Sequence, residues 1–419
     1  MPKISAARGR SVQIAIVATF FTQGAISTTQ IPRIPELIDQ IGVNFSAWGL
    51  IIGLSGLGSL LGLTVANRFI NRFGAKRVIL LGSVLASLMI MTLGLATNPF
   101  VFFMLQAGMA FAMSCFNIAL NSQSVVLQKA LNRTIIGRFH AAWSIGATSS
   151  AAVSGVLASF MPLWIHLILV PGLAIIAFIL VGRNLLTDEE GEAVESRQST
   201  KRIPFFKSPP QVWLLAAGLF ASVFPELVMM DWSAVFAKTE LGLNASLGAI
   251  PYAAFTGAMI IGRLLIGRLT KRWHISDLSK WGGIFGSVAF GLGVILGPLL
   301  AEQDKYLALA VTAGLWALFG FGLAPMVPSF FSAAGYVKGL STAQTLARMS
   351  LANSLVVIGA KIALGAVAQG VSLTVAFIMP TILLFVAGWL AGIVAKRSKR
   401  SEAVANAFPL TGPIGVIEN

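Results

Sequence analysis

The stretch IGVNFS at residues 41–46 is followed 200 residues later by LGLNAS at residues 241–246. The same offset relates further positions along the chain: Gly42 and Gly242, Asn44 and Asn244, Ser46 and Ser246, Gly62 and Gly262, Arg68 and Arg268, and Arg72 and Arg272. Ser46 and Ser246 are each expected just before a helix, where a hydroxyl can cap free backbone N–H groups. The matched glycines favour close helix contacts, as small residues do in membranes. The chain is therefore predicted to contain one structural unit twice.

The composition predicts that both copies of this unit lie in a membrane. Hydrophobic residues make up 56% of the chain and charged residues only 11%, whereas soluble domains average roughly 25% charged residues. The charges also gather in short segments between long uncharged runs, which is typical of a multi-span helical membrane protein. The net charge of +15 does not indicate a nucleic-acid partner, because the basic residues lie between apolar spans rather than along one soluble face.

A helix needs about 20 apolar residues to cross the hydrocarbon of a bilayer. The sequence contains twelve such runs: 11–34, 46–66, 77–96, 99–127, 138–160, 162–182, 211–237, 246–267, 279–301, 305–332, 344–369 and 372–395. If both chain ends lie on one side, the opposite loops hold three of the thirty basic residues, namely Arg33, Lys238 and Lys305. Lys361 lies inside a span, and the remaining twenty-six lie on the side of the termini. This asymmetry predicts a multi-pass plasma-membrane protein with both termini in the cytoplasm.

The longest connection, residues 183–210, separates six spans from the next six. It contains DEEGEAVE and then RQSTKR, and its five acids and five bases are typical of a solvated linker. We therefore expect an N-terminal six-helix bundle at 1–182, a cytoplasmic linker at 183–210, a C-terminal six-helix bundle at 211–400 and a cytoplasmic tail at 401–419. Parallel repeats of this kind place a substrate site at their interface, near the middle of the membrane.

Twelve spans, a central cytoplasmic loop and a basic loop between spans 2 and 3 resemble the major facilitator superfamily. The most specific part is NRFINRFGAKR at residues 67–77, which is similar to the loop signature of that family: Gly, three residues, Asp-Arg, any residue, Gly-Arg-Lys. Arg72, Gly74 and Lys76 match it, whereas Asn71 replaces the usual Asp and Asn67 the usual Gly. Without the acid, the resemblance does not carry the usual charge relay of that loop to this chain.

Three further stretches support the resemblance. GFGLAPMVPSFF at 320–331 resembles span 10 of the family, and GRFHAAWSIGA at 137–147 and MMDWSAVF at 229–236 resemble a poorly characterised bacterial subgroup. The resemblance implies an all-α membrane fold of two pseudo-symmetric six-helix bundles. It also implies that spans 1, 4, 7 and 10 line a central path.

The basic loop and its repeat form a candidate gating loop, comprising Arg68, Arg72, Gly74, Lys76, Arg268 and Arg272. Cations at such a corner can bind the carbonyl ends of neighbouring helices and attract anionic headgroups. They either stabilise one closed state of a gate or only determine topology.

Ionisable residues well inside the spans are few, namely Glu226, Asp231 and Lys361. Each costs several kcal/mol in a bilayer, and a buried charge survives if it is paired. Glu226 and Lys361 lie about 15 and 17 residues into outward-running spans, roughly 22 and 25 Å deep, and are therefore at similar heights. We expect Lys361 to pair with one acid of span 7, with Asp231 slightly favoured, because residues five apart lie about 140° apart around a helix. The pair either belongs to an ion or substrate pathway or is purely structural.

Amide side chains in spans 1 and 4 are candidates for the lining of the central cavity: Gln23, Asn117 and Asn121. No cluster of His, Cys and acidic residues has metal-ligand spacing, and no Gly-rich loop precedes a Lys-Ser/Thr pair. We therefore expect no metal, no cofactor, no nucleotide and no enzymatic activity. The single cysteine, Cys115, excludes an internal disulfide.

These features predict a monomeric secondary transporter that binds a small-molecule substrate and H⁺ in the lipid bilayer. We expect a small polar solute, of the sugar or organic acid class, to move by alternating access with proton coupling. One alternative is efflux of multiple drugs or lipophilic cations, and another is facilitated transport without coupling. A third is a receptor or assembly factor that has kept the fold without transport.

Overall fold

The computed structural model describes residues 5–131, 135–187, 189–190, 205, 208–337 and 339–407. Within these residues all regular secondary structure is helical. The first half consists of α1 (Ala6–Thr28), the 3₁₀ turn η1 (Ile31–Arg33), α2 (Ile34–Ile41), α3 (Phe45–Leu54), α4 (Gly56–Phe73), α5 (Ala75–Leu93), α6 (Pro99–Leu131), α7 (Ile136–Leu157) and α8 (Leu163–Gly182). The second half consists of α10 (Pro210–Thr239), α11 (Ala245–Gly248), α12 (Ile250–Leu269), α13 (Ile275–Ala301), α14 (Lys305–Leu323), α15 (Met326–Ala334), α16 (Thr342–Gly370), α17 (Leu373–Ala376) and α18 (Ile378–Ala407).

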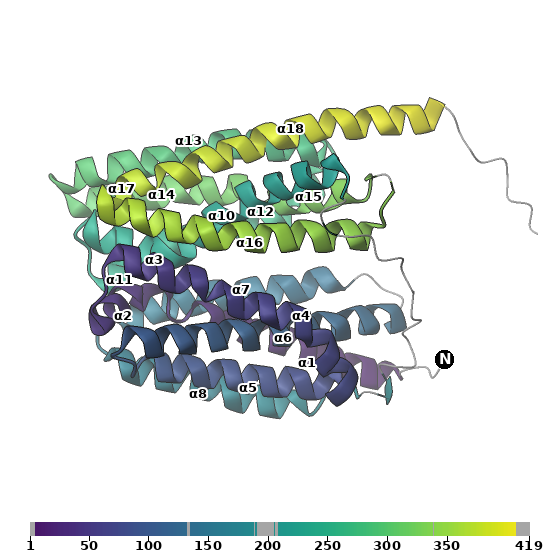
Figure 1. The fold of residues 1–419 in the computed structure, drawn as a ribbon, viewed down its shortest axis with the longest axis horizontal. Coiled ribbons are helices and arrows are strands. Elements are labelled where there is room, and N and C mark those ends of the chain that lie inside the picture. The colour runs from purple at the N-terminus through teal and green to yellow at the C-terminus, as the bar shows by residue number, and fades with distance from the viewer. Residues whose placement is uncertain are drawn as a thin grey trace, which may run out of the picture.

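The two halves lie side by side as two bundles of long helices, the first coloured purple to teal and the second green to yellow (Figure 1). Their internal packing is equivalent. In the first bundle α1 packs on α7, α4 and α5 pack on α6, and α5 packs on α8. In the second bundle α10 packs on α16, α12 and α13 pack on α14, and α13 packs on α18. This correspondence matches the pseudo-symmetric pair of bundles that the sequence repeat predicts.

Eleven helical segments of the described chain are long and apolar enough to cross a membrane, judged by length and composition alone. The remaining expected span, 138–160, corresponds to α7, a helix of 22 residues. Its sequence is rich in Ser, Ala, Gly and Thr and begins with Arg138 and His140, which lowers its mean hydropathy. These small residues let α7 pack tightly on α1, so that a Cβ at Gly146 would lie 2.0 Å from the carbonyl oxygen of Phe21.

The repeated stretch forms the same turn in both bundles. Gly42 and Gly242 adopt the left-handed conformation, with φ of 65° and 63°, which a side chain would strain. The prediction that Ser46 and Ser246 are the helix caps is wrong. Asn44 caps α3 by accepting a hydrogen bond at Oδ1 from the backbone N–H of Ala47 (2.9 Å), and Asn244 caps α11 in the same way. Both helices begin directly after the asparagine, which leaves each serine in the first turn.

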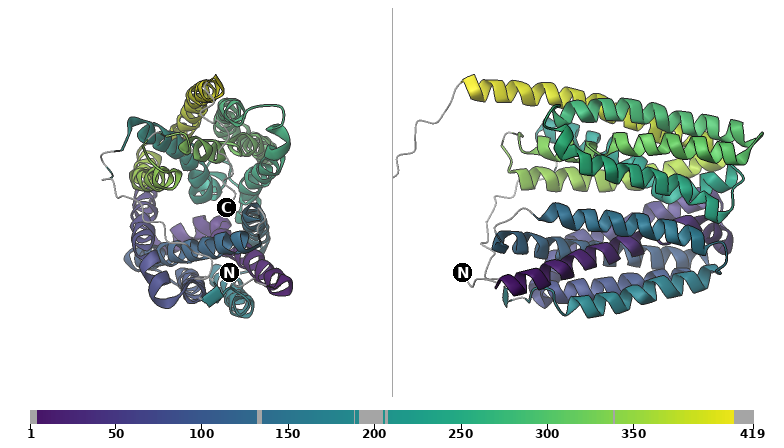
Figure 2. Two further views of the ribbon diagram at one scale, coloured as in Figure 1. Left: turned by 90° about the vertical axis from the view of Figure 1, so that its right-hand side faces the viewer. Right: turned by 180° about the vertical axis from the view of Figure 1, so that it is seen from behind.

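The expected domain boundaries meet the helices as follows. α8 ends at Gly182 and α10 begins at Pro210, on either side of the expected linker. Most of the charged part of that linker, residues 191–204, lies outside the described residues. α18 continues through residue 400 to Ala407, past the expected start of the tail. We call the end of the molecule with Gly182 and Pro210 the linker end and the opposite end, where α2, α3 and α11 lie, the far end. The start of α1 and the end of α18 also lie at the linker end (Figure 1, Figure 2).

Contacts between the bundles join α3 to α16, α7 to α11 and α12, and α10 to α2 and η1. The backbones of α3 and α16 touch at a pair of glycines, since a Cβ at Gly49 would lie 2.7 Å from the Cα of Gly365. Towards the far end, Lys238 of α10 forms an ion pair with Asp39 of α2. The described contacts between the bundles therefore concentrate in the half of the molecule near the far end.

The charge distribution predicts that Arg33 lies in a loop opposite the termini, but its side chain is only 1% exposed. Its guanidinium donates to the carbonyl oxygen of Met161 (3.0 Å) and forms an ion pair with Glu36 (2.8 Å). It lies in η1, between α1 and α2, and therefore still belongs to the far end. The cation joins this turn to the short connection between α7 and α8.

Candidate functional site

Helix α10 carries both acids that the sequence singles out, and the second of them meets Lys361. The Nζ of Lys361 on α16 lies 2.6 Å from Oδ2 of Asp231. The side chains of Lys361 and Asp231 are 16% and 21% exposed, so the pair is largely but not completely buried. Beyond this ion pair, the buried Oδ2 of Asp231 has no hydrogen-bond partner among the described residues. Of the two possible partners, the structure pairs Lys361 with the slightly favoured one.

Glu226 has a different partner, which the sequence analysis does not predict. Its Oε1 lies 3.7 Å from a guanidinium nitrogen of Arg263 on α12, and the two side chains are 20% and 33% exposed. Each lies thirteen residues from the far end of its helix, at Thr239 and Ile250 respectively, or about 20 Å along the axis. Arg263 is therefore a second cation deep in a span, and the prediction that Lys361 is the only one is wrong. The signal that could have found it is its place inside the expected apolar run 246–267, between Gly262 and Leu264.

Glu226 and Asp231 pair with cations on two different neighbouring helices because their side chains point in different directions around α10. Five residues correspond to about 140° around a helix, and α10 packs on both α16 and α12. Pro225 lies inside α10 directly before Glu226. A proline removes one hydrogen bond of the helix ladder, so the backbone next to this carboxylate is less constrained than in a regular helix.

The Asp231–Lys361 pair lies directly beside the contact between the bundles. On the α16 side, a Cβ at Gly49 of α3 would lie 2.9 Å from the carbonyl oxygen of Lys361. On the α10 side, Trp232 packs its ring against Phe45, the first residue of α3, with ring centroids 5.9 Å apart. Trp232 is 1% exposed and so acts as a packing residue. A change in the position of either charged helix would therefore alter the contact with α3.

The predicted amide residues lie in the other bundle. Gln23 of α1 is buried. On α6, the side-chain amide of Asn121 donates to both the side-chain and the backbone oxygens of Asn117. None of the hydrogen bonds between described residues joins these three amides to the ion pairs of α10. Their part in a central site remains a prediction.

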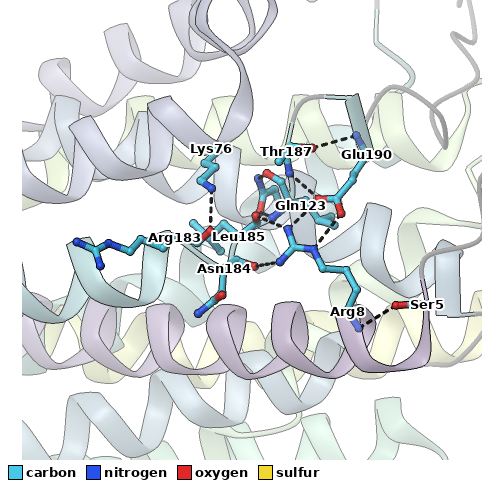
Figure 3. Close-up of polar contacts among 10 residues, drawn as sticks. Ser5, Arg8, Lys76, Gln123, Arg183, Asn184, Leu185, Thr187 and Glu190 are labelled. Carbon is cyan, nitrogen blue, oxygen red and sulfur yellow. Dashed lines mark hydrogen bonds and ion pairs between the residues drawn. The ribbon is translucent and has the colours of Figure 1, made fainter.

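Lys76 is the member of the candidate gating loop with a clear structural partner. Its Nζ donates to the carbonyl oxygen of Arg183 (2.9 Å), directly after the end of α8 (Figure 3). Gly74 has a φ of 82°, which turns the chain from α4 into α5. Arg72 rests on the ring of Phe73, with 5.4 Å from guanidinium to centroid. The remaining members, Arg68, Arg268 and Arg272, are exposed at the linker end.

The start of the linker is tied to the first bundle by a second basic residue (Figure 3). Arg8 of α1 donates to both carboxylate oxygens of Glu190, at 2.9 and 2.8 Å, and to the carbonyl oxygens of Asn184 and Leu185. The hydrogen bond from Arg8 lowers the pKa of Glu190 to about 2. Gln123 of α6 binds both backbone groups of Leu186. These contacts fix the chain where it leaves α8.

Comparisons with known proteins agree with this architecture. A family model described as the Major Facilitator Superfamily matches residues 16–338. An uncharacterized MFS-type transporter of Yersinia pestis is 28% identical over 379 residues, covering 90% of this chain and 94% of the relative. An uncharacterized transporter of Sinorhizobium fredii is 27% identical over 387 residues, covering 91% and 95%.

Two solved structures have the same fold. The nucleoside transporter NupG aligns with a TM-score of 0.65 at 13% identity, covering 92% of this chain and 98% of that one. A D-xylose–proton symporter aligns with a TM-score of 0.68 at 12% identity, covering 91% and 97%. At this identity the likeness is one of fold.

Proposed function

Because the chain belongs to the major facilitator superfamily, we propose that it carries a small polar solute across the bacterial inner membrane, with proton coupling and alternating access. The observation that supports this most directly is the Asp231–Lys361 ion pair at the contact between the bundles. Paired charges inside a membrane mark ion and substrate pathways. A pair at this contact is also suited to control which end of the molecule is open.

The proposed coupling step is a protonation of Asp231. The neutral carboxyl no longer holds the ammonium of Lys361 by charge, so α10 and α16 lose an attraction of opposite charges. Lys361 lies where α16 touches α3 at Gly49, and a small displacement of α16 therefore changes the contact between the bundles. Loss of the proton to the other side restores the pair and completes the cycle.

Arg263 and Glu226 give the same helix a second pair that can exchange partners. At 3.7 Å this contact is looser than the pair at Asp231. An anionic group of a solute would compete with Glu226 for the guanidinium, which offers two parallel donors to a carboxylate. This favours organic acids within the proposed polar class, while the amides Gln23, Asn117 and Asn121 suit hydroxyl-rich solutes equally well.

The names of two structures with this fold are consistent with a polar solute, since one is a nucleoside transporter and the other a D-xylose–proton symporter. Efflux of lipophilic cations is the main alternative, and facilitated transport without coupling and a receptor without transport are the others. These functions differ in what binds the purified protein, in whether that compound moves and in whether its movement depends on a pH gradient.

Binding is tested by a thermal-stability screen of the purified protein against sugars, organic acids, amino acids and lipophilic cations. Wild type, Lys361→Ala and the matched control Lys305→Ala are compared, because Lys305 is an exposed lysine at the far end. We expect a polar class to stabilise wild type and Lys305→Ala but not Lys361→Ala. Stabilisation by lipophilic cations would support efflux instead, and equal binding by Lys361→Ala would remove Lys361 from the site.

Coupling is tested by uptake of the identified solute into proteoliposomes with and without an imposed pH gradient. Wild type should accumulate the solute only with the gradient. Asp231→Asn should still exchange labelled for unlabelled solute but should not accumulate it. Accumulation by Asp231→Asn equal to wild type would contradict the coupling role, and absence of flux in a folded protein that binds the solute would favour the receptor.

A further inference from the structure

A groove of about 830 Å³ runs along the second bundle between α12, α13 and α14. Its walls are large apolar side chains that are widely exposed, including Phe285 at 65% and Leu318 at 61%. α13 packs on α14, α15 and α18, all of the same bundle. The groove therefore faces away from the central site and, in a membrane, towards the lipid.

Glycines form the floor of this groove, namely Gly262, Gly282, Gly286 and Gly322. A Cβ at Gly282 would lie 2.3 Å from the carbonyl oxygen of Gly322, so α13 and α14 touch there through their backbones. These glycines bring the helices close together beneath the groove, and the surrounding rings form its walls. The result is a long apolar channel with an open side rather than a closed pocket.

The length of the groove matches one leaflet of a bilayer. From Asp277 to Leu292 it follows α13 over sixteen residues, a rise of about 22 Å. One leaflet with its headgroups occupies half of a bilayer of about 40–45 Å. Trp273 and Trp281, which line the linker end of the groove, are 53% and 50% exposed. Tryptophan is enriched at the level of the headgroups, so this end lies at the membrane surface.

Positive charge gathers at the same end. Arg268, Lys271 and Arg272 follow one another around the end of α12 and are exposed. The Nζ of Lys280 lies 4.6 Å from the centroid of the Trp281 ring, although the stem of this lysine packs beside Gly392 of α18. Within the described residues none of these four cations takes part in an ion pair. The lining contributes one acid, Asp277, so the mouth remains cationic.

We propose that the groove binds a phospholipid with an anionic headgroup from the leaflet at the linker end. One acyl chain lies between α12, α13 and α14, and the phosphate lies against the basic cluster of Arg268, Lys271 and Arg272. Basic clusters at the membrane surface attract anionic headgroups, and the groove supplies an apolar surface for the acyl chain of the lipid. The inference requires only that the protein spans a membrane and does not depend on the transported solute.

The test uses delipidated protein in detergent, to which dioleoylphosphatidylglycerol or dioleoylphosphatidylcholine is added, with binding followed by native mass spectrometry. We expect phosphatidylglycerol to be retained over phosphatidylcholine. Arg268→Gln/Arg272→Gln should weaken retention by about fivefold for each charge removed. The matched control is Arg68→Gln/Arg72→Gln, which removes the same charges from the equivalent repeat positions outside the lining of the groove and should weaken retention less.

Two further measurements test whether the acyl chain occupies the groove and whether the headgroup alone is sufficient for binding. Brominated acyl chains should quench tryptophan fluorescence less in Trp281→Phe than in wild type. Such a difference would place the acyl chain of the lipid in the groove. Soluble glycerol phosphate, which has the headgroup chemistry without the chain, should not compete. Equal losses in the two double variants, equal retention of the two lipids, or full competition by glycerol phosphate would each overturn the proposal.

Discussion

Lys361 and Asp231 explain how an apolar helix tolerates a charge. Each would be costly alone in the membrane, and each is held by a partner on the neighbouring helix at 2.6 Å. The pair is nevertheless about one-fifth exposed, as the proposed coupling step requires. Stability and function therefore depend on different properties of the same contact and can be separated by substitution.

Lys361→Met should destabilise the protein by up to about 3 kcal/mol, because it leaves a carboxylate without its cation in a largely shielded place. Lys361→Met/Asp231→Leu should recover most of that loss, since no unpaired charge remains. Thermal unfolding in detergent measures both, with Lys305→Met as the control for an exposed lysine. A double variant as unstable as the single one would show that packing rather than charge is responsible.

Glu190 gives a prediction about pH. Its folded pKa of about 2 lies below its ordinary value of 4.5, so the ion pair with Arg8 contributes its full stability above pH 4.5. That contribution is lost as the pH falls from 4.5 towards 2. The Tm difference between wild type and Glu190→Gln should therefore be constant at higher pH and shrink through this range. Glu189→Gln, an exposed neighbour, should show no such difference; a constant gap down to pH 2 would contradict the pairing.

Single residues also show which contacts the sequence alone does not predict. The apolar run around Lys361 and the need for a counter-charge predict its pairing with α10. Distance along the chain cannot tell which carboxylate faces it, because that depends on how two helices are rotated. Arg263 is not predicted as a buried cation because it lies near several loop arginines in the sequence. In the structure it lies thirteen residues from Ile250, where α12 begins at the far end.

Among the helices, those that carry the repeat show what a local pattern can determine. Gly42 and Gly242, with Asn44 and Asn244, form the same turn and cap in both bundles. The sequence predicts the helix, but it assigns Gly42 and Gly242 to close helix contacts, whereas they form the turn and a Cβ there would meet nothing within 4 Å. The prediction of the cap falls on the wrong residue because asparagine and serine are both good caps. Only the observed start of each helix decides between them.

Asn44→Ala and Asn244→Ala should each lower stability by about 1 kcal/mol, because each leaves backbone N–H groups of a first turn without a partner. Ser46→Ala and Ser246→Ala are the matched controls and should have little effect. Tm values of the four single variants provide the comparison. Larger losses at the serines than at the asparagines would contradict the observed caps.

For the whole molecule, hydropathy and the distribution of basic residues are sufficient to predict the helical spans and the two bundles. They do not predict how the bundles meet, because that depends on side-chain volume at a few positions. The meeting point is the glycine contact of α3 and α16, reinforced near the far end by Asp39 and Lys238. These contacts form only in a conformation in which the far end is closed.

Gly49→Val should disfavour that conformation, because a Cβ there would lie 2.7 Å from the Cα of Gly365. A cross-link between Asp39→Cys and Lys238→Cys, in a Cys115→Ser background, should form readily in the parent and much less after Gly49→Val. Gly257→Val is the control, since a Cβ at Gly257 meets nothing within 4 Å. Equal cross-linking in all three proteins would show that the glycine contact does not govern closure.

The position of this contact along the helices has a mechanical consequence. A Cβ at Gly56, at the start of α4, would still lie 3.0 Å from Ile358 of α16, whereas α4 extends to Phe73 at the linker end. If α3 and α4 rotate about this contact, the arm from Gly49 to Phe45 is about 6 Å long. The arm from Gly56 to Phe73 is about 26 Å long. A rotation of about 15° would move the tip of the long arm by about 7 Å and that of the short arm by less than about 2 Å. With such unequal arms, a displacement of less than about 2 Å at Phe45 corresponds to one of about 7 Å at Phe73.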